Sequence, residues 1–135
     1  HIMNNESSPS SYVDGFRLNP ADYTIRAVNN ARKTLRAGFT TIRDLGDGDG
    51  ISVAVRNAIN AGSVEGPRIY TSGKSIASTG GHADPTNGRN LDLTGDPGPR
   101  DGVINGADEA RKAVRQRYKE GSDLVKVTAT GGVLS

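Results

Sequence analysis

The sequence predicts an α/β fold, and more narrowly a partial (β/α)8 TIM barrel with about three parallel strands that alternate with helices. Strand-like and helix-like segments follow one another along the chain, an order that produces right-handed βαβ crossovers and a parallel sheet. The strand-like segments also separate polar from apolar residues on their two faces, which suits a barrel wall better than a doubly wound sheet. These faces are Thr41 and Arg43 against Ile42, and Lys126 and Thr128 against Val125 and Val127.

Composition limits the size of the core and the classes of partner. The chain has 135 residues, enough for one domain, but only 33% are hydrophobic, and 18 glycines and 6 prolines predict many loops. A formal charge of +2 with scattered basic residues gives no nucleic-acid signal, and the absence of cysteine excludes disulfides and thiolate metal sites. No apolar run approaches the roughly 18 residues of a membrane span, so no membrane partner is expected, and the compartment stays unknown.

Residues 1–19 are expected to be a tag remnant and flexible lead-in. They are polar, rich in serine and asparagine, and show no periodicity, and His1-Ile2-Met3 looks like a remnant of cloning. The folded domain is therefore predicted to cover residues 20–135.

Three helices are predicted inside that domain. The first covers about 20–37, because Asn19 and Pro20 suit an N-cap and first helical position, and Gly38 suits the C-terminal cap. The second begins at Ile51 and stops before Gly62. The third covers about 107–120, and its packed side is expected to include Ala110, Ala113, Val114, Arg117 and Tyr118.

Strands are predicted at about 39–44, 67–71 and 123–128. The last is short, rich in valine and threonine, and bounded by glycine. Alternation places Lys126 on one face, while Val125 and Val127 occupy the face expected to pack against helices. Burial favours a neutral amine at Lys126, which could form a Schiff base, act as a general base, or take up carbon dioxide as a metal-binding carbamate. The alternative is a packed stem whose ammonium reaches water.

A stretch of about thirty residues, 72–105, lacks periodicity, and a loop of that length inside a domain often carries function. It contains His82, the only internal histidine, for which a polar surface role is the alternative to a functional one. Ser72-Gly73-Lys74-Ser75 is not a phosphate-binding P-loop, because Arg68 stands where the motif needs glycine.

Four segments together resemble the metal-dependent amidohydrolase superfamily, in its imidazolonepropionase and Xaa-Pro dipeptidase (prolidase-like) branch. They are residues 35–46 (LRAGFTTIRDLG), 66–73 (GPRIYTSG), 79–84 (TGGHAD) and 124–135 (LVKVTATGGVLS). The resemblance covers roughly residues 20–135, and its specificity comes from the order of the four segments rather than from any single one.

The resemblance implies hydrolysis of C–N bonds in a small-molecule amide, cyclic amide or dipeptide, with divalent metal, zinc being the expected ion. Lys126 matches the lysine that is carboxylated and bridges two metals in a full-length parent, and His82 matches a loop histidine near the substrate pocket. The family's first-strand His-x-His pair should precede residue 20 but is not found there, and the later ligands would lie beyond Ser135.

The chain is therefore expected to be a fragment of about three βα units, inactive in isolation, with no complete catalytic set and no metal of its own. The alternative is a non-catalytic α/β module that persists by self-association. Both hypotheses include a homo-oligomer, because the outer strands of a short parallel sheet present unpaired N–H and C=O groups.

Overall fold

The computed structural model describes residues 1–4 and 11–132. Seven elements follow in chain order: α1 (Ser11–Arg17), α2 (Pro20–Arg36), β1 (Thr41–Asp44), α3 (Ile51–Asn60), β2 (Arg68–Thr71), α4 (Leu91–Thr94) and α5 (Ala107–Lys119). None of the helices within the described ranges is long and apolar enough to cross a membrane.

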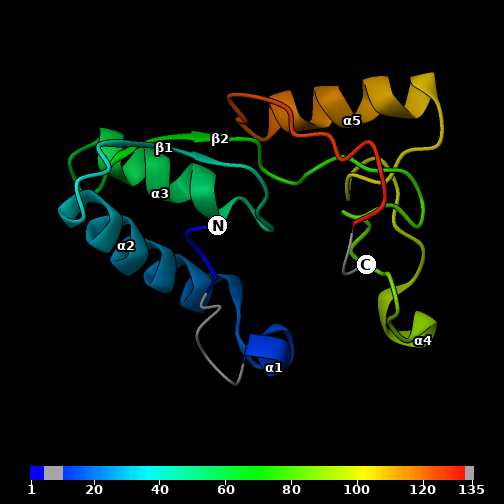
Figure 1. Ribbon diagram of the computed structural model, residues 1–135, viewed down its shortest axis with the longest axis horizontal. Coiled ribbons are helices and arrows are strands. Elements are labelled where there is room, and N and C mark those ends of the chain that lie inside the picture. Colours follow the sequence, from blue (N-terminus) through cyan, green and yellow to red (C-terminus); the bar gives the residue numbers. More distant parts are fainter. Residues whose placement is uncertain (5–10, 133–135) are drawn as a thin grey trace.

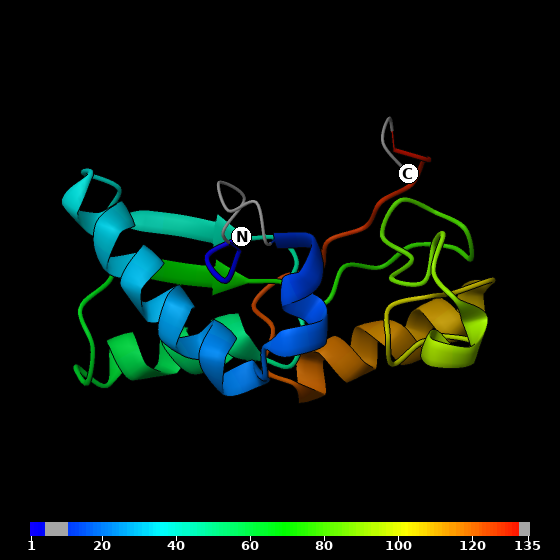
Figure 2. The same cartoon turned by 90° about the horizontal axis from the view of Figure 1, so that it is seen from below.

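The two strands pair in parallel, from Thr41 opposite Arg68 to Asp44 opposite Thr71. Helices α2 and α3 pack against each other, and α3 packs against β2, as Figures 1 and 2 show. The apolar core lies where these elements meet and is small, consisting of buried Ile2, Ala27, Ala31, Ile51, Val55 and Ile69. All members of this cluster precede residue 70, and four further buried apolar residues, Ile76, Ala77, Val103 and Ala113, lie outside it. Parallel α/β architecture is confirmed, while a closed barrel is not part of this structure.

Local signals explain the helices that were predicted correctly. Helix α2 begins at Pro20, and the carboxylate of Asp22 accepts a hydrogen bond from the backbone N–H of Asn19 at 2.9 Å. Gly38 follows the helix with a φ of +97°, a left-handed conformation that glycine adopts without steric cost. The predicted range 20–37 thus matches α2 to within one residue.

The prediction of a flexible lead-in over residues 1–19 is wrong for the described part of that range. Ile2 is 8% exposed and belongs to the apolar core, and its backbone N–H donates to Asp44 Oδ2 at 3.0 Å. Residues 11–17 form α1, whose Asp14 binds Arg26 of α2 at 2.8 Å. Low periodicity misled the prediction, because a single buried isoleucine and one ion pair leave no repeating pattern.

The third predicted strand, 123–128, does not form as a strand. The backbone N–H of Asp123 donates to Thr71 O, and then only Val127 bridges in parallel to Ile76. Residues 72–75 leave the ladder in between, since Gly73 turns with a φ of +58° and its carbonyl accepts from Asp47 N at 3.0 Å. Val125 and Val127 are 42% and 57% exposed, so the expectation that they pack against helices is also wrong.

Helix α5 buries only part of the face that was expected to pack. Ala113 and Arg117 are buried as predicted, but Val114 is 45% and Tyr118 is 85% exposed. The Arg117 guanidinium donates to the carbonyls of Lys74, at 3.2 Å, and Arg100, at 2.6 Å. Its Nε lies 3.2 Å from Glu120 Oε2 as an ion pair without hydrogen-bond geometry. Arg117 therefore fastens both ends of the 74–100 loop to α5.

Replacing Arg117 by methionine is expected to lower the free energy of unfolding by about 2 kcal/mol, since two partly buried carbonyls lose their donors while the apolar stem is kept. Urea unfolding monitored by circular dichroism measures the change. Arg115→Met on the exposed side of the same helix is the matched control and is expected to have little effect. Equal stability of the two variants would contradict the role given to Arg117.

Candidate functional site

The structure places both residues selected from the sequence, Lys126 and His82, on the wall of one cavity of about 450 Å³. We call it the lysine cavity. Beside these two residues, it is lined by His1, Arg43, Leu45, Ser75, Ala83 and Thr128. Its walls come from the chain start, the end of β1, the long loop and the 124–128 segment, so they meet at the carboxyl ends of the parallel strands. Functional side chains of parallel α/β folds gather at this edge.

Lys126 is held by the backbone of the neighbouring segment. Ile76 N donates to the Lys126 carbonyl at 2.8 Å, and Thr128 N donates to the Ile76 carbonyl at 2.8 Å. Alternation then turns Leu124, Lys126 and Thr128 to the half-buried side, as predicted. Within the described part of the chain, the Lys126 ammonium has no hydrogen bond or ion pair. It is half-buried and forms no salt bridge there.

A polar network fixes the start of that segment. Asp123 Oδ2 accepts from Thr71 N at 2.9 Å and from Arg56 Nη1 at 2.7 Å, and the same nitrogen of Arg56 reaches the Gly121 carbonyl at 2.8 Å. Ser122 Oγ donates to the Ser72 carbonyl at 3.0 Å. These bonds anchor the segment to β2 and α3 and so determine where Lys126 lies.

His1 is the site residue that the sequence interpretation missed. Its Nδ1 lies 2.8 Å from Oδ1 of Asp44, which is 3% exposed, and its Nε2 has no partner among the described residues. Gly46 leaves room for the ring, since a Cβ there would lie 3.1 Å from His1 Cε1. A carboxylate on one nitrogen and an open second nitrogen is the usual arrangement of a metal-binding histidine. The available signal was the apolar pair Ile2-Met3 directly after it.

The turn that carries His82 is built around Asp84, which is 7% exposed. Its carboxylate accepts from Gly80 N at 2.9 Å, from Thr86 N at 2.9 Å and from Thr86 Oγ1 at 2.7 Å. The hydrogen bond from Gly80, followed by those from Thr86, lowers the pKa of Asp84 below its ordinary value. The ionised carboxylate thus shapes the turn that presents His82 to the cavity.

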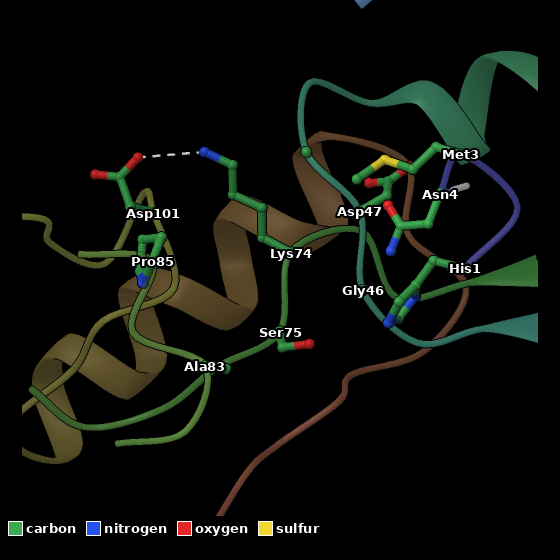
Figure 3. A pocket seen from close by; sticks show the side chains of 11 residues that line it. His1, Met3, Asn4, Gly46, Asp47, Lys74, Ser75, Ala83, Pro85 and Asp101 are labelled. Atoms are coloured by element: carbon green, nitrogen blue, oxygen red, sulfur yellow. Dashed lines mark hydrogen bonds and ion pairs between the residues drawn. The ribbon is translucent and has the colours of Figure 1, made fainter. Parts of the chain in front are cut away.

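A second cavity, of about 340 Å³, adjoins the first, and both include His1, Ser75 and Ala83 in their walls. Figure 3 shows Lys74 extending across it toward Asp101, with Nζ and Oδ1 3.2 Å apart. Asp47 lies on the opposite side, close to Met3 and Asn4. A ligand longer than the lysine cavity would extend here.

Asp47 is a buried carboxyl with an incomplete set of partners. One oxygen accepts from Ser52 N at the start of α3, while Oδ1 is buried without a hydrogen bond among the described residues. Burial raises its pKa, against the lowering effect of Ser52, and Asp44 and Asp49 add repulsion.

Asp47→Asn is expected to stabilise the protein near neutral pH. Because the folded-state pKa lies above the unfolded value of 3.8, the folded state retains the proton longer, and stability falls as pH rises from about 4 through the folded-state pKa. Asparagine keeps an acceptor for Ser52 N and removes this loss. The gain should appear in thermal melts at pH 7 and vanish below pH 4, and a gain independent of pH would contradict this account.

Two residues of the cavity wall have donor groups that a metal ion could use. Lys126 as a carbamate and His1 through Nε2 would supply oxygen and nitrogen ligands on one cavity wall. In the described portion of the chain, however, no three His, Cys, Asp or Glu residues cluster closely enough to hold a metal ion. Among the described residues, Lys126 and His1 could therefore supply two ligands of a metal ion.

Lys126, His1 and His82 thus line one cavity at the edge where the parallel strands end, the edge that carries the functional side chains in parallel α/β folds. The chain belongs to the amidohydrolase family, whose model matches residues 1–135. That match includes the first nineteen residues, which the sequence interpretation had placed outside the domain.

Individual relatives agree with this assignment. Ochratoxinase of Aspergillus niger is 33% identical over 147 residues, covering 100% of this chain and 30% of that protein. A Xaa-Pro dipeptidase solved with methionine bound in its active site is 50% identical, with a TM-score of 0.84 over 88% of this chain and 29% of the other. A prolidase complexed with N-methylphosphonate-L-proline is 32% identical, with a TM-score of 0.71 over 87% and 29%. The chain thus spans about 30% of the ochratoxinase length.

Proposed function

We propose that this chain provides the Lys126 side of a metal-dependent active site that hydrolyses the C–N bond of a small amide or dipeptide. The observation that carries the proposal is the lysine cavity, where an unpaired lysine lies on the same wall as His1, whose other nitrogen is held by buried Asp44. The similarity to a Xaa-Pro dipeptidase and a prolidase supports a dipeptide substrate.

Lys126 would enter the site as a carbamate. Its neutral amine would attack carbon dioxide, so that an N–C bond forms, one C=O π bond opens and nitrogen loses one proton, and the carbamate carries a single negative charge shared by two oxygens. The carbamate and His1 Nε2 would then hold divalent metal, zinc being the expected ion. The metal would supply polarisation of the scissile carbonyl.

The other residues have supporting tasks under this proposal. Asp44 holds the His1 tautomer with the proton on Nδ1, which leaves Nε2 free to donate its lone pair. His82, placed by the turn around Asp84, would contact the substrate. Because two ligands do not retain a metal pair, the 135-residue chain by itself is expected to lack hydrolytic activity and to leave Lys126 unmodified.

The proposal is tested by exchange into the 50% identical Xaa-Pro dipeptidase, with residues 1–135 replacing the matching segment. The chimera is expected to contain metal by elemental analysis and to hydrolyse Xaa-Pro dipeptides, whereas the isolated chain does neither. A folded chimera that contains metal but hydrolyses no C–N bond in a panel of dipeptides and N-acyl amino acids would overturn the proposal.

A self-associating module is the second candidate, favoured by the exposure of Val125 and Val127 beside an incomplete strand ladder. Under it, the 123–128 segment pairs with its copy in a homo-oligomer. Val127→Asp is expected to raise the dimer dissociation constant at least about tenfold in sedimentation equilibrium. Val114→Asp on exposed α5 is the matched control, and a wild-type chain that remains monomeric at every concentration would exclude this candidate.

A further inference from the structure

The lysine cavity is cationic. Arg43 and Lys126 both line it, and no aspartate or glutamate does so among the described residues. Asp44, the nearest carboxylate in sequence, is already bound by His1 and by the N–H of Ile2. While Lys126 is unmodified, two positive charges without an opposing carboxylate favour an anionic ligand, and Arg43 keeps its charge when Lys126 is a carbamate.

Arg43 is an exposed side chain of the cavity wall whose guanidinium, like the Lys126 ammonium and His1 Nε2, has no partner among the described residues. Other polar groups of the wall have partners: Ser75 Oγ donates to the Leu45 carbonyl at 2.8 Å, and Thr128 Oγ1 approaches the Ile76 carbonyl at 3.4 Å. Arg43, by contrast, makes no hydrogen bond or ion pair with any residue in the ranges 1–4 and 11–132. It occupies the penultimate position of β1, one residue from the histidine-binding Asp44.

We propose that Arg43 binds the carboxylate of the substrate and so selects for amides that carry a free acid. The proposal deepens the function above and rests on it for the identity of the reaction, although the binding itself needs no metal. Arginine suits the task because its planar, permanently charged fork donates two parallel hydrogen bonds to a carboxylate. Lys126 does not suit it, because carboxylation converts that side chain into an anion.

The same chemistry has a second possible source, since the carbamate of Lys126 is also a carboxylate-like anion in this cavity. Arg43 could stabilise that group instead of the substrate. The two sources predict different results when Arg43 is replaced. If Arg43 binds the substrate carboxylate, the preference for acidic ligands is lost. If it binds the carbamate, carboxylation of Lys126 is lost.

The experiment uses the metal-free 135-residue chain, labelled with nitrogen-15 and titrated with N-acetyl-L-proline or N-acetyl-L-prolinamide. The two probes differ in one group, a free carboxylate in N-acetyl-L-proline and a neutral carboxamide in N-acetyl-L-prolinamide. N-Acetyl-L-proline is expected to shift the amide resonances of β1 and of the Lys126 segment and to bind at least about tenfold more tightly than the amide. Arg43→Gln should abolish that difference, Arg43→Lys should retain part of it, and Arg68→Gln on the neighbouring strand should leave it unchanged.

Three results would overturn the assignment. One is equal binding of the two probes by the wild-type chain. Another is a preference for N-acetyl-L-proline over N-acetyl-L-prolinamide that the Arg43→Gln variant keeps and the Lys126→Met variant loses. The third, measured with carbon-13 bicarbonate on the metal-loaded chimera, is loss of the carbamate signal in Arg43→Gln while carboxylate discrimination persists. Since the titration is metal-free and the chimera assay measures hydrolysis, failure of this assignment can be told from failure of the proposed function.

Discussion

Replacing Lys126 by methionine in the dipeptidase chimera is expected to reduce hydrolysis by at least about 10³-fold. Methionine matches the length and apolar stem of lysine but cannot take up carbon dioxide, so the carbamate oxygens are lost while packing is kept. Elemental analysis should show reduced metal content in the same preparation.

Lys112→Met is the matched control for this experiment, because Lys112 is exposed on α5 and does not line the lysine cavity. It should retain activity within about twofold and full metal content. Undiminished hydrolysis in Lys126→Met would contradict the metal-ligand role, and a loss of activity at full metal content would place Lys126 in the chemical step.

Gly102→Ala is expected to produce the largest loss of stability, about 3 kcal/mol or more. Gly102 has a φ of +94°, and a Cβ there would lie 2.1 Å from the Ser75 carbonyl oxygen. No side-chain rotation relieves this clash, because the Ser75 oxygen belongs to the backbone. The backbone segments are also held together, since the Gly102 carbonyl accepts a hydrogen bond from Ala77 N at 2.9 Å. The strain would fall on residues 75–77, next to the lysine cavity.

The control for this substitution is Gly98→Ala in the same loop, where a new Cβ meets nothing within 4 Å. Urea unfolding of both variants measures the difference, with the alanine at 98 expected to change the free energy of unfolding by less than about 0.5 kcal/mol. A Gly102→Ala variant as stable as Gly98→Ala would show that the loop moves aside without cost.

The sequence predicted those elements whose signals are local. Pro20 and Gly38 bracket α2, and each of the first two strands is a short segment with β-branched residues that follows a helix and its terminal glycine. The third strand failed because a ladder depends on its partner. Gly73 turns the 72–75 segment away from residues 123–126, and no pattern within 123–128 reports that turn.

The site was only partly predictable for a related reason. Lys126 was conspicuous as a charged residue in an apolar run, and His82 as the only internal histidine. His1 gains its meaning from a bond to Asp44 across 43 positions of sequence, which periodicity cannot reveal. Arg117 was placed on the packed side of α5, but the carbonyls of Lys74 and Arg100 that justify its burial come from a loop without any regular pattern.

The location of the apolar core bears on how the molecule opens. The cluster of six buried residues lies between Ile2 and Ile69, whereas four other buried apolar residues, Ile76, Ala77, Val103 and Ala113, belong to the loop and α5. Polar contacts join the two parts, among them those of Asp123 with Arg56 and with Thr71 N. A part of a protein that contributes nothing to the main apolar cluster can open locally, at a free energy below that of global unfolding, and its amide protons then exchange. Residues 74–130 should therefore form a separate, less protected exchange unit. The wall that carries Lys126 and His82 would then rearrange around a ligand while α2, α3 and the strands remain folded.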